Sequence, residues 1–164
     1  MSTNPDVSEF RKMGKDFEAY LRCHIFVKKY YVSMEMSEED QSNGTNKIDS
    51  SDLPDFKFRD KRHQQPFFLE AKFREKESEE KINWCTTAQL KRYQELENLF
   101  PLFILIGFGG KPDNPQKLFL FPLSEASGTE LPMQAALKFE IPLCKAIIPE
   151  DLWKMTKPEY KKAG

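Results

Sequence analysis

The sequence of 164 residues lacks the features of several protein classes. Its longest apolar run, residues 100–108, has the length of a strand and falls far short of the ~20 residues of a membrane-spanning helix. The polar N-terminus carries no apolar segment of the kind found in secretory signals. We therefore expect a protein without a membrane span that resides in the cytoplasm.

Cysteine and histidine are scarce as well. The three cysteines, Cys23, Cys85 and Cys144, are scattered along the chain and lack the close pairing of a zinc site. We expect three reduced thiols, as in a cytosolic protein. The two histidines stand in no Ser-His-Asp or Cys-His pattern, and the chain has no phosphate-binding P-loop. These absences argue against zinc-site proteins, triad hydrolases and P-loop enzymes.

Net charge is also nearly absent, at −1. A protein that coats nucleic acid through bulk charge would be strongly basic. The charge is uneven, however. From residue 55 to residue 74 there are six Lys or Arg against three Asp or Glu, an excess of +3. Any nucleic-acid surface is therefore expected to be local and to surround this segment.

What the sequence has in quantity is phenylalanine, with 14 residues, and 39% apolar residues overall. At this length we expect one domain over residues 1–164, with its core at about residues 7–122 and a peripheral C-terminal third. Residues 7 to about 31 have helical spacing, with an apolar stripe of Phe10, Gly14, Phe17, Leu21 and Ile25. Residues 37–52 predict a long irregular loop.

Strands and a second helix follow this loop. Strands are predicted at 55–60, 67–74, 102–107 and 117–122, and a helix from Thr86 or Thr87 to about Leu99. Later signals are weaker: residues 130–139 favour a helix and residues 146–148 an extended segment. The order of helix, strands, helix and strands is typical of an α/β protein with a mixed central sheet flanked by helices.

A candidate site lies on the first two of these strands. Glu70 and Lys72 share one strand face, and Asp55 can project to the same side if the strands pair. Two carboxylates and the carbonyl group of Ala71 suit a hard cation such as Mg²⁺, or Mn²⁺ in its place. The cation would polarise a phosphoryl group and lower the pKa of bound water, and Lys72 would hold the phosphate or orient the water.

The same spacing has two simpler explanations. An Asp followed downstream by Glu-x-Lys arises by chance in a chain rich in charged residues. A Glu-x-Lys pair can also be a surface salt bridge, worth ~0–1 kcal/mol.

Two helices supply further residues. Gln89 and Tyr93 are i,i+4 neighbours on the helix after the second strand, so this helix turns an amide towards the interior. A Gln hydrogen-bonded to backbone is the ordinary alternative. On the first helix, Glu18 borders the apolar stripe and is a candidate extra acidic ligand, although a glutamate at a helix edge is more often solvated.

Together, Glu18, Asp55, Glu70, Lys72, Gln89 and Tyr93 resemble the ordered motif of the PD-(D/E)xK nuclease superfamily. The Gln-x-x-x-Tyr element is similar to that of RecB-like members. The resemblance covers about two-thirds of the chain and implies a restriction-endonuclease-like core in the order α-β-β-β-α-β. It also implies that Asp55, Glu70 and Ala71 bind metal, and that Gln89 and Glu18 assist.

The leading hypothesis is thus a Mg²⁺-dependent nuclease acting on nucleic acid, with DNA favoured. Lys57, Arg59, Arg74 and Tyr93 are candidate contacts to nucleic acid, and a homodimer is possible by analogy. One alternative is a catalytically silent nuclease-like domain that binds nucleic acid or protein. Another is a structural α/β domain without a site, which would leave Glu70 and Lys72 exposed on an outer strand.

Overall fold

The computed structural model describes residues 7–43, 46–47, 52–75 and 80–156. In chain order, the elements are α1 (Val7–His24), β1 (Tyr31–Met34), β2 (Ser42–Asn43), β3 (Asn46–Lys47), β4 (Phe56–Asp60), β5 (Pro66–Arg74), β6 (Lys81–Asn83), α2 (Thr87–Leu96), β7 (Leu102–Lys111), β8 (Asn114–Pro122), the 3₁₀ helix η2 (Leu123–Glu125), β9 (Glu130–Pro132), α3 (Met133–Leu137), β10 (Glu140–Ile141) and α4 (Pro149–Lys154). None of the described helices has the length and apolar character needed to cross a membrane.

A six-stranded mixed sheet forms the centre of the molecule, in the order β1-β4-β5-β7-β8-β10. Only β5 and β7 run parallel among its strand pairs, and the other neighbours are antiparallel. A parallel pair needs a long crossover connection, and here it contains β6 and α2. Helix α1, strands β1, β4 and β5, helix α2 and strand β7 follow the predicted α-β-β-β-α-β order. The predicted α/β fold with a central mixed sheet is confirmed.

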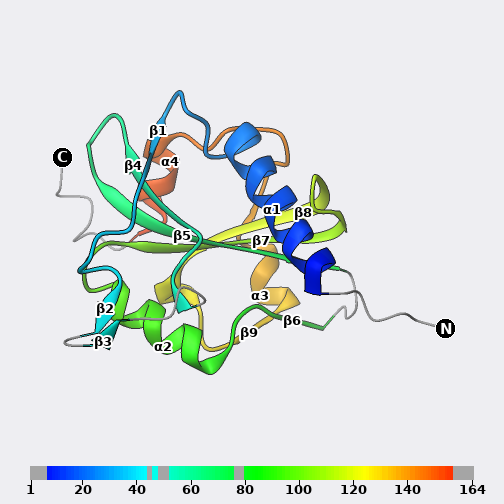
Figure 1. Ribbon diagram of the computed structural model, residues 1–164. Helices are drawn as coiled ribbons and strands as arrows, with labels where there is room; N and C mark the ends of the chain where they lie inside the picture. Colours follow the sequence, from blue (N-terminus) through cyan, green and yellow to red (C-terminus); the bar gives the residue numbers. More distant parts are fainter. Residues whose placement is uncertain (1–6, 44–45, 48–51, 76–79, 157–164) are drawn as a thin grey trace.

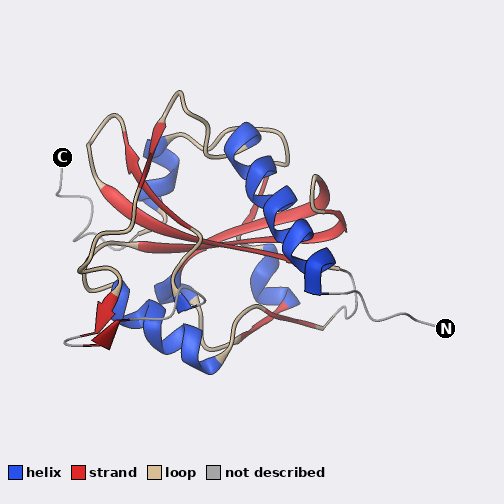
Figure 2. Ribbon diagram, in the orientation of Figure 1, coloured by secondary structure: helices blue, strands red, loops and turns tan. Residues whose placement is uncertain are grey.

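Helices cover both faces of this sheet (Figures 1 and 2). Helices α1 and α4 lie on one face, where the first buried cluster contains Phe17, Phe58, Phe67 and Trp153. Helices α2 and α3, with the β6–β9 ribbon, lie on the other face, where the second cluster contains Trp84. The layers follow from strand alternation, because successive side chains of each strand point to opposite faces.

The C-terminal third belongs to both clusters. Leu152 and Trp153 are buried in the first, and Leu131 and Ala136 in the second. The core therefore extends beyond the predicted residues 7–122. Short β9, α3 and α4 segments supply these side chains, and their shortness explains why the periodicity there gave only a weak signal.

Glycine at residue 107 brings α1 onto the sheet. A Cβ atom at this position would lie 2.5 Å from Cε1 of Phe17, so any larger residue on β7 would push that ring away. Phe17 also packs against Phe73 of β5, with ring centroids 5.8 Å apart. Helix α1 is thereby fixed over β5 and β7, the two parallel strands.

The local predictions differ from the structure mainly at element ends. Helix α1 ends at His24 rather than near residue 31, and residues 31–34 form β1 instead. Helix α2 begins after Thr86, whose side chain completes a capping box with Gln89. Residues 130–139 divide into β9 and α3, and residues 146–148 form no strand. Part of the predicted loop at 37–52 lies outside the described residues.

Candidate active site

The β4–β5 hairpin opens at the position where the sequence has its two acidic residues. Strand pairing ends with Phe56 opposite Leu69. Asp55 lies one residue beyond this pair, and Glu70 lies one residue beyond it on the other strand. Oδ2 of Asp55 accepts a 2.9 Å hydrogen bond from the backbone N–H of Ala71. The carboxylate of Asp55 thus replaces the strand pairing that would otherwise continue at this edge of β5.

The carbonyl group of Ala71 points to the same open edge. In a paired strand, the N–H and C=O groups of one residue face the same neighbour, and the N–H of Ala71 faces Asp55. Along β5, the backbone N–H and C=O groups of successive residues point in turn towards β4 and towards β7. The N–H of Phe68, for example, donates a 2.8 Å hydrogen bond to the carbonyl group of Pro101, just before β7. Backbone and carboxylate oxygen atoms therefore meet in the opening of the hairpin.

Glu70 is a buried acid, with 3% of its surface exposed. Its Oε2 accepts a 2.7 Å hydrogen bond from the hydroxyl group of Tyr93, and its Oε1 lies 3.3 Å from Nζ of Lys72. Burial, followed by the charge of Asp55, raises the pKa of Glu70 well above its usual value, whereas Lys72 and the Tyr93 hydrogen bond act in the opposite direction. The carboxylates of Asp55 and Glu70 are therefore close neighbours.

Lys72 is largely buried too, with 16% of its side chain exposed. It stands two residues after Glu70 on β5, so both side chains point to the face covered by α2. The prediction for a structural domain without a site, in which Glu70 and Lys72 are exposed on an outer strand, is wrong. Strand β5 is internal to the sheet, between β4 and β7.

Glu18 joins the two acids from α1, on the other side of β5. Burial raises the pKa of Glu18 to about 7; repulsion by Asp55 and a hydrogen bond between the two carboxyl groups add to the shift, while Arg22 and Lys15 oppose it. Three carboxyl groups from α1, the segment before β4, and β5 thus converge. Ionising all three carboxyl groups would raise the free energy of the folded state unless a positive charge lies beside them.

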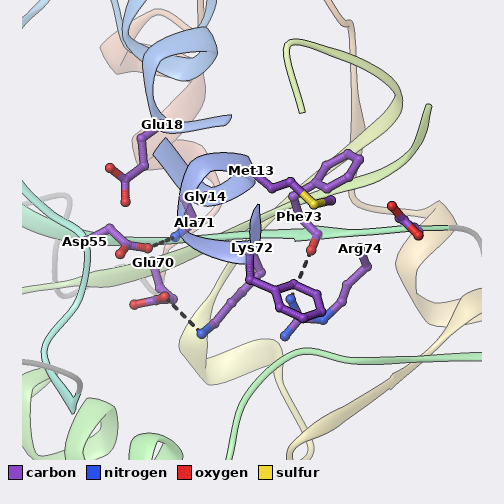
Figure 3. A pocket seen from close by; sticks show the side chains of 11 residues that line it. Met13, Gly14, Glu18, Asp55, Glu70, Ala71, Lys72, Phe73 and Arg74 are labelled. Carbon is purple, nitrogen blue, oxygen red and sulfur yellow. Dashed lines mark hydrogen bonds and ion pairs between the residues drawn. The ribbon is translucent and has the colours of Figure 1, made fainter. Parts of the chain in front are cut away.

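A cavity of about 400 Å³ contains these groups (Figure 3). It lies between the first half of α1 and the end of β5. Its lining consists of Phe10, Met13, Gly14, Glu18, Asp55, Glu70, Ala71, Lys72, Phe73, Arg74 and Glu75. The structure therefore brings five of the predicted catalytic or metal-binding residues into one cavity, namely Glu18, Asp55, Glu70, Ala71 and Lys72.

Gln89, the remaining predicted catalytic residue, does not line this cavity. Its Oε1 accepts a 3.1 Å hydrogen bond from the backbone N–H of Thr86, and this contact caps α2. Tyr93, four residues later, is fully buried and bonded to Glu70. The Gln-x-x-x-Tyr element thus reaches the site through its tyrosine.

The predicted contacts to nucleic acid lie in varied surroundings. Lys57 is buried, with Nζ 2.7 Å from Oδ2 of the buried Asp40. Arg74 donates hydrogen bonds to the carbonyl groups of Asn83, at 2.8 Å, and Phe73, at 3.0 Å. Arg59 is half-buried, and its Nε has no hydrogen-bond partner within the described part of the chain.

Two features of the site had no clear signal in the sequence. Phe10, predicted to be in the buried stripe of α1, is 57% exposed at the cavity, and the whole segment 7–12 of the helix is exposed. Cys85 lies near the site as well: burial raises the pKa of its thiol to about 11, and Lys72 and Glu70 influence it with opposite sign. Only the three-dimensional course of the chain after β5 places this cysteine there.

The donor set fits a hard divalent cation. In the described residues, no three His, Cys, Asp or Glu side chains form a ready-made metal site. Mg²⁺ does not require one, since it usually binds one or two carboxylates and keeps several waters. Clustered carboxyl groups with raised pKa values are also the electrostatic condition that a divalent cation relieves.

Comparisons with known proteins address the fold. No protein-family model matches the chain, and no curated protein matches it. Among solved structures, the chain is similar to Archaeoglobus fulgidus Hjc, a Holliday junction resolvase from an archaeal hyperthermophile. The TM-score is 0.50 at 9% identity, and the match covers 82% of this chain and 96% of Hjc.

The chain shares the fold of this resolvase. Hjc is a member of the PD-(D/E)xK nuclease superfamily, so the resemblance deduced from the sequence motif is confirmed at the level of the fold. The restriction-endonuclease-like arrangement of sheet and helices is confirmed with it. Fold alone leaves activity open, and the functional argument therefore depends on the residues in the cavity.

Proposed function

We propose that this protein is a divalent-metal-dependent nuclease that hydrolyses phosphodiester bonds of DNA. The proposal rests on one observation: Asp55, Glu70 and Lys72 line the same cavity. The PD-(D/E)xK fold raises the expectation of such chemistry, because the neighbour Hjc is a Holliday junction resolvase. We further propose a cytoplasmic protein, with a homodimer as one possible assembly.

The carboxylates of Asp55 and Glu70 and the carbonyl group of Ala71 would hold Mg²⁺ or Mn²⁺. A bound cation of this kind supplies Lewis-acid polarisation of the phosphoryl group and lowers the pKa of coordinated water. The convergence of acidic groups at the open end of the hairpin supports this assignment. Tyr93 would fix the orientation of Glu70 through its 2.7 Å hydrogen bond.

Lys72 would contact the scissile phosphate or orient the attacking water. Its ammonium group lies 3.3 Å from Glu70 and lines the cavity. In a largely buried setting, a fixed positive charge stabilises the additional negative charge of a transition state more strongly than it would in water. Glu18 would hold or accept a proton beside Asp55, since burial raises its pKa to about 7.

Arg74 lines the cavity and would contact the nucleic-acid backbone there. Arg59 is half-buried on β4 opposite Pro66, at the other end of the hairpin, and would contact the backbone only away from the cavity. Lys57 is not included in the proposed surface, because its ammonium group is buried against Asp40. Tyr93 is likewise assigned to Glu70 rather than to nucleic acid, and Gln89 stays in the proposal through its capping of α2, the helix that carries Tyr93.

The test is cleavage of plasmid DNA with Mg²⁺ or Mn²⁺ and with EDTA. We expect metal-dependent cutting that Lys72→Ala abolishes, while Lys81→Ala, at a half-exposed lysine of β6, leaves it unchanged. Cutting that persists in EDTA and in Lys72→Ala would refute the proposal. A wild-type protein that binds no metal and cuts nothing would instead favour the catalytically silent binding module.

A further inference from the structure

The cavity beside the acidic residues has two chemically different parts. Glu18, Asp55, Glu70 and Lys72 form its polar part. The other part is apolar and is lined by Phe10, Met13, Gly14 and Phe73. Figure 3 shows Glu18 and Asp55 on one side of Lys72, and Met13 and Phe73 on the other. With a volume of about 400 Å³, the cavity exceeds what a phosphate group alone requires and is in the size range of small-molecule sites.

Gly14 keeps the apolar part open. It lies in the interior of α1, where glycine is less favourable than alanine. Its backbone needs no positive φ, unlike that of Gly109 and Gly110. A Cβ atom at Gly14 would meet no atom within 4 Å, whereas one at Gly107 would collide with Phe17. Neither packing nor backbone geometry thus explains this glycine, but its effect is to leave space above the cavity.

An exposed aromatic ring lines this space, and two basic residues lie on the neighbouring face of the same helix. Phe10 lines the cavity with 57% of its surface exposed. Arg11 and Lys15 are exposed one turn apart on α1, and Lys15 is close enough to Glu18 to lower its pKa. Cations next to an exposed ring are typical of surfaces that bind the backbone and stack the bases of single strands.

We propose that the apolar part receives the base of an unpaired nucleotide, next to the phosphate that reaches Lys72. The substrate class is then nucleic acid with a single-stranded segment at the cleavage point. Bases within a duplex have both faces covered by their neighbours, so a base enters such a pocket only after leaving the stack. Arg11 and Lys15 would hold the adjoining phosphates. This inference rests on the proposed nuclease function, because it assigns the phosphate to Lys72.

The test fills the space without touching the acids. Gly14→Leu adds an apolar side chain where a Cβ has room, and leucine favours helix over glycine, so we expect an unchanged or higher Tm. Gly14→Ala fills less space. Gly128→Leu is the matched control, because a Cβ atom there also meets no atom within 4 Å and Gly128 does not line the cavity. Phe10→Ala removes the ring and alters only an exposed side chain.

Binding is measured by fluorescence anisotropy with Ca²⁺ in place of Mg²⁺, on a labelled single-stranded oligothymidylate and on a blunt duplex. For the single strand, we expect Gly14→Leu and Phe10→Ala to weaken binding roughly tenfold, the difference expected from one stacked base. Gly14→Ala should have a smaller effect and Gly128→Leu none. Duplex binding should be weaker than single-strand binding and should not change in any variant.

Three results would overturn the inference. The first is equal binding of single strands by wild type, Gly14→Leu and Phe10→Ala. The second is an equal loss for single strand and duplex. The third is a wild-type dimer that Phe10→Ala converts to monomers in light scattering, because the ring would then contact a second copy. Gly14-dependent binding of single strands without any cleavage in Mg²⁺ would support the pocket while refuting the nuclease proposal.

Discussion

The hydroxyl group of Tyr93 on α2 donates a 2.7 Å hydrogen bond to Oε2 of Glu70 on β5. Both side chains are buried, with 0% and 3% of their surface exposed. The buried carboxylate of Glu70 is therefore oriented by a helix from a different layer. Its geometry depends on how α2 packs against the sheet as well as on the strand that carries it.

Tyr93→Phe should remove this hydrogen bond while keeping the ring. Loss of a hydrogen bond behind a ligand usually lowers metal affinity or activity by about 10- to 100-fold, and we expect that range for Mg²⁺-dependent cleavage. Tyr31→Phe is the matched control, since the buried Tyr31 hydroxyl donates a 2.8 Å bond to Ile147 O, away from the cavity. It should cost about 1 kcal/mol of stability and leave cleavage unchanged. Equal activity losses in both variants would indicate a general packing defect.

Glu18→Gln should change the pH dependence of stability in EDTA. The Glu18 pKa is about 7 in the folded protein against an ordinary value of 4.5. Between these values the folded state binds more protons than the unfolded state, so the Glu18 contribution falls as pH rises and is fully lost above about pH 7. The variant should therefore be more stable than wild type by roughly 1 kcal/mol at about pH 8, a magnitude reduced by solvent screening.

Urea unfolding of both proteins at about pH 5 and about pH 8 measures this difference. The gain at the higher pH should shrink at the lower pH, where Glu18 is protonated in the folded wild type. A gain that is the same at both pH values would show that the side-chain substitution, rather than the charge, is responsible.

Mg²⁺ should raise the Tm of the wild-type protein. A ligand that binds only the folded state stabilises it by RT ln(1 + [L]/Kd), which is about 2.7 kcal/mol at a hundredfold excess over Kd. Asp55→Asn should abolish most of this shift, although the asparagine oxygen can still accept the N–H of Ala71. Asp113→Asn, an exposed change in the β7–β8 turn, should preserve it. Differential scanning fluorimetry over a Mg²⁺ series distinguishes the two outcomes.

Lys57→Met should destabilise the protein strongly. Lys57 and Asp40 form a 2.7 Å ion pair with side chains 6% and 1% exposed, and removal of one partner leaves a buried charge, at a cost of about 3–5 kcal/mol. Lys81→Met is the control: the Lys81–Glu130 pair is half exposed, so its loss should cost less than about 1 kcal/mol. A thermal unfolding curve for Lys57→Met that matches wild type would contradict the structural role.

The relative positions of four candidate residues could be predicted from the sequence, because strand alternation and local chain order determine them. Asp55, Glu70 and Lys72 were predictable because two adjacent strands form a hairpin and side chains two apart share a face. Glu18 was predictable because it borders the stripe that packs α1 on the sheet. The structure brings these four residues to one cavity, and their roles stay a prediction.

Contacts between residues far apart in the sequence could not be predicted in the same way. Lys57 was a candidate contact to nucleic acid, yet it is buried in an ion pair with Asp40 of the preceding loop. Phe10 fitted the apolar stripe, but residues 7–12 of α1 are not covered by other elements, so the ring is exposed. Periodicity reports which residues share a face and not how far the opposite surface extends.

The opening of the β4–β5 hairpin also bears on the order in which the protein folds. Asp55 and Glu70 are separated by a short connection, so the loop-closure entropy of bringing them together is small. Glu18 must come from α1 across a much longer loop, and contacts of that kind form slowly. Asp55 and Glu70 can therefore come together when the hairpin forms, while Glu18 joins them when α1 docks on the sheet. Lengthening the segment between β1 and β4 should accordingly slow completion of the site and leave the acid pair intact.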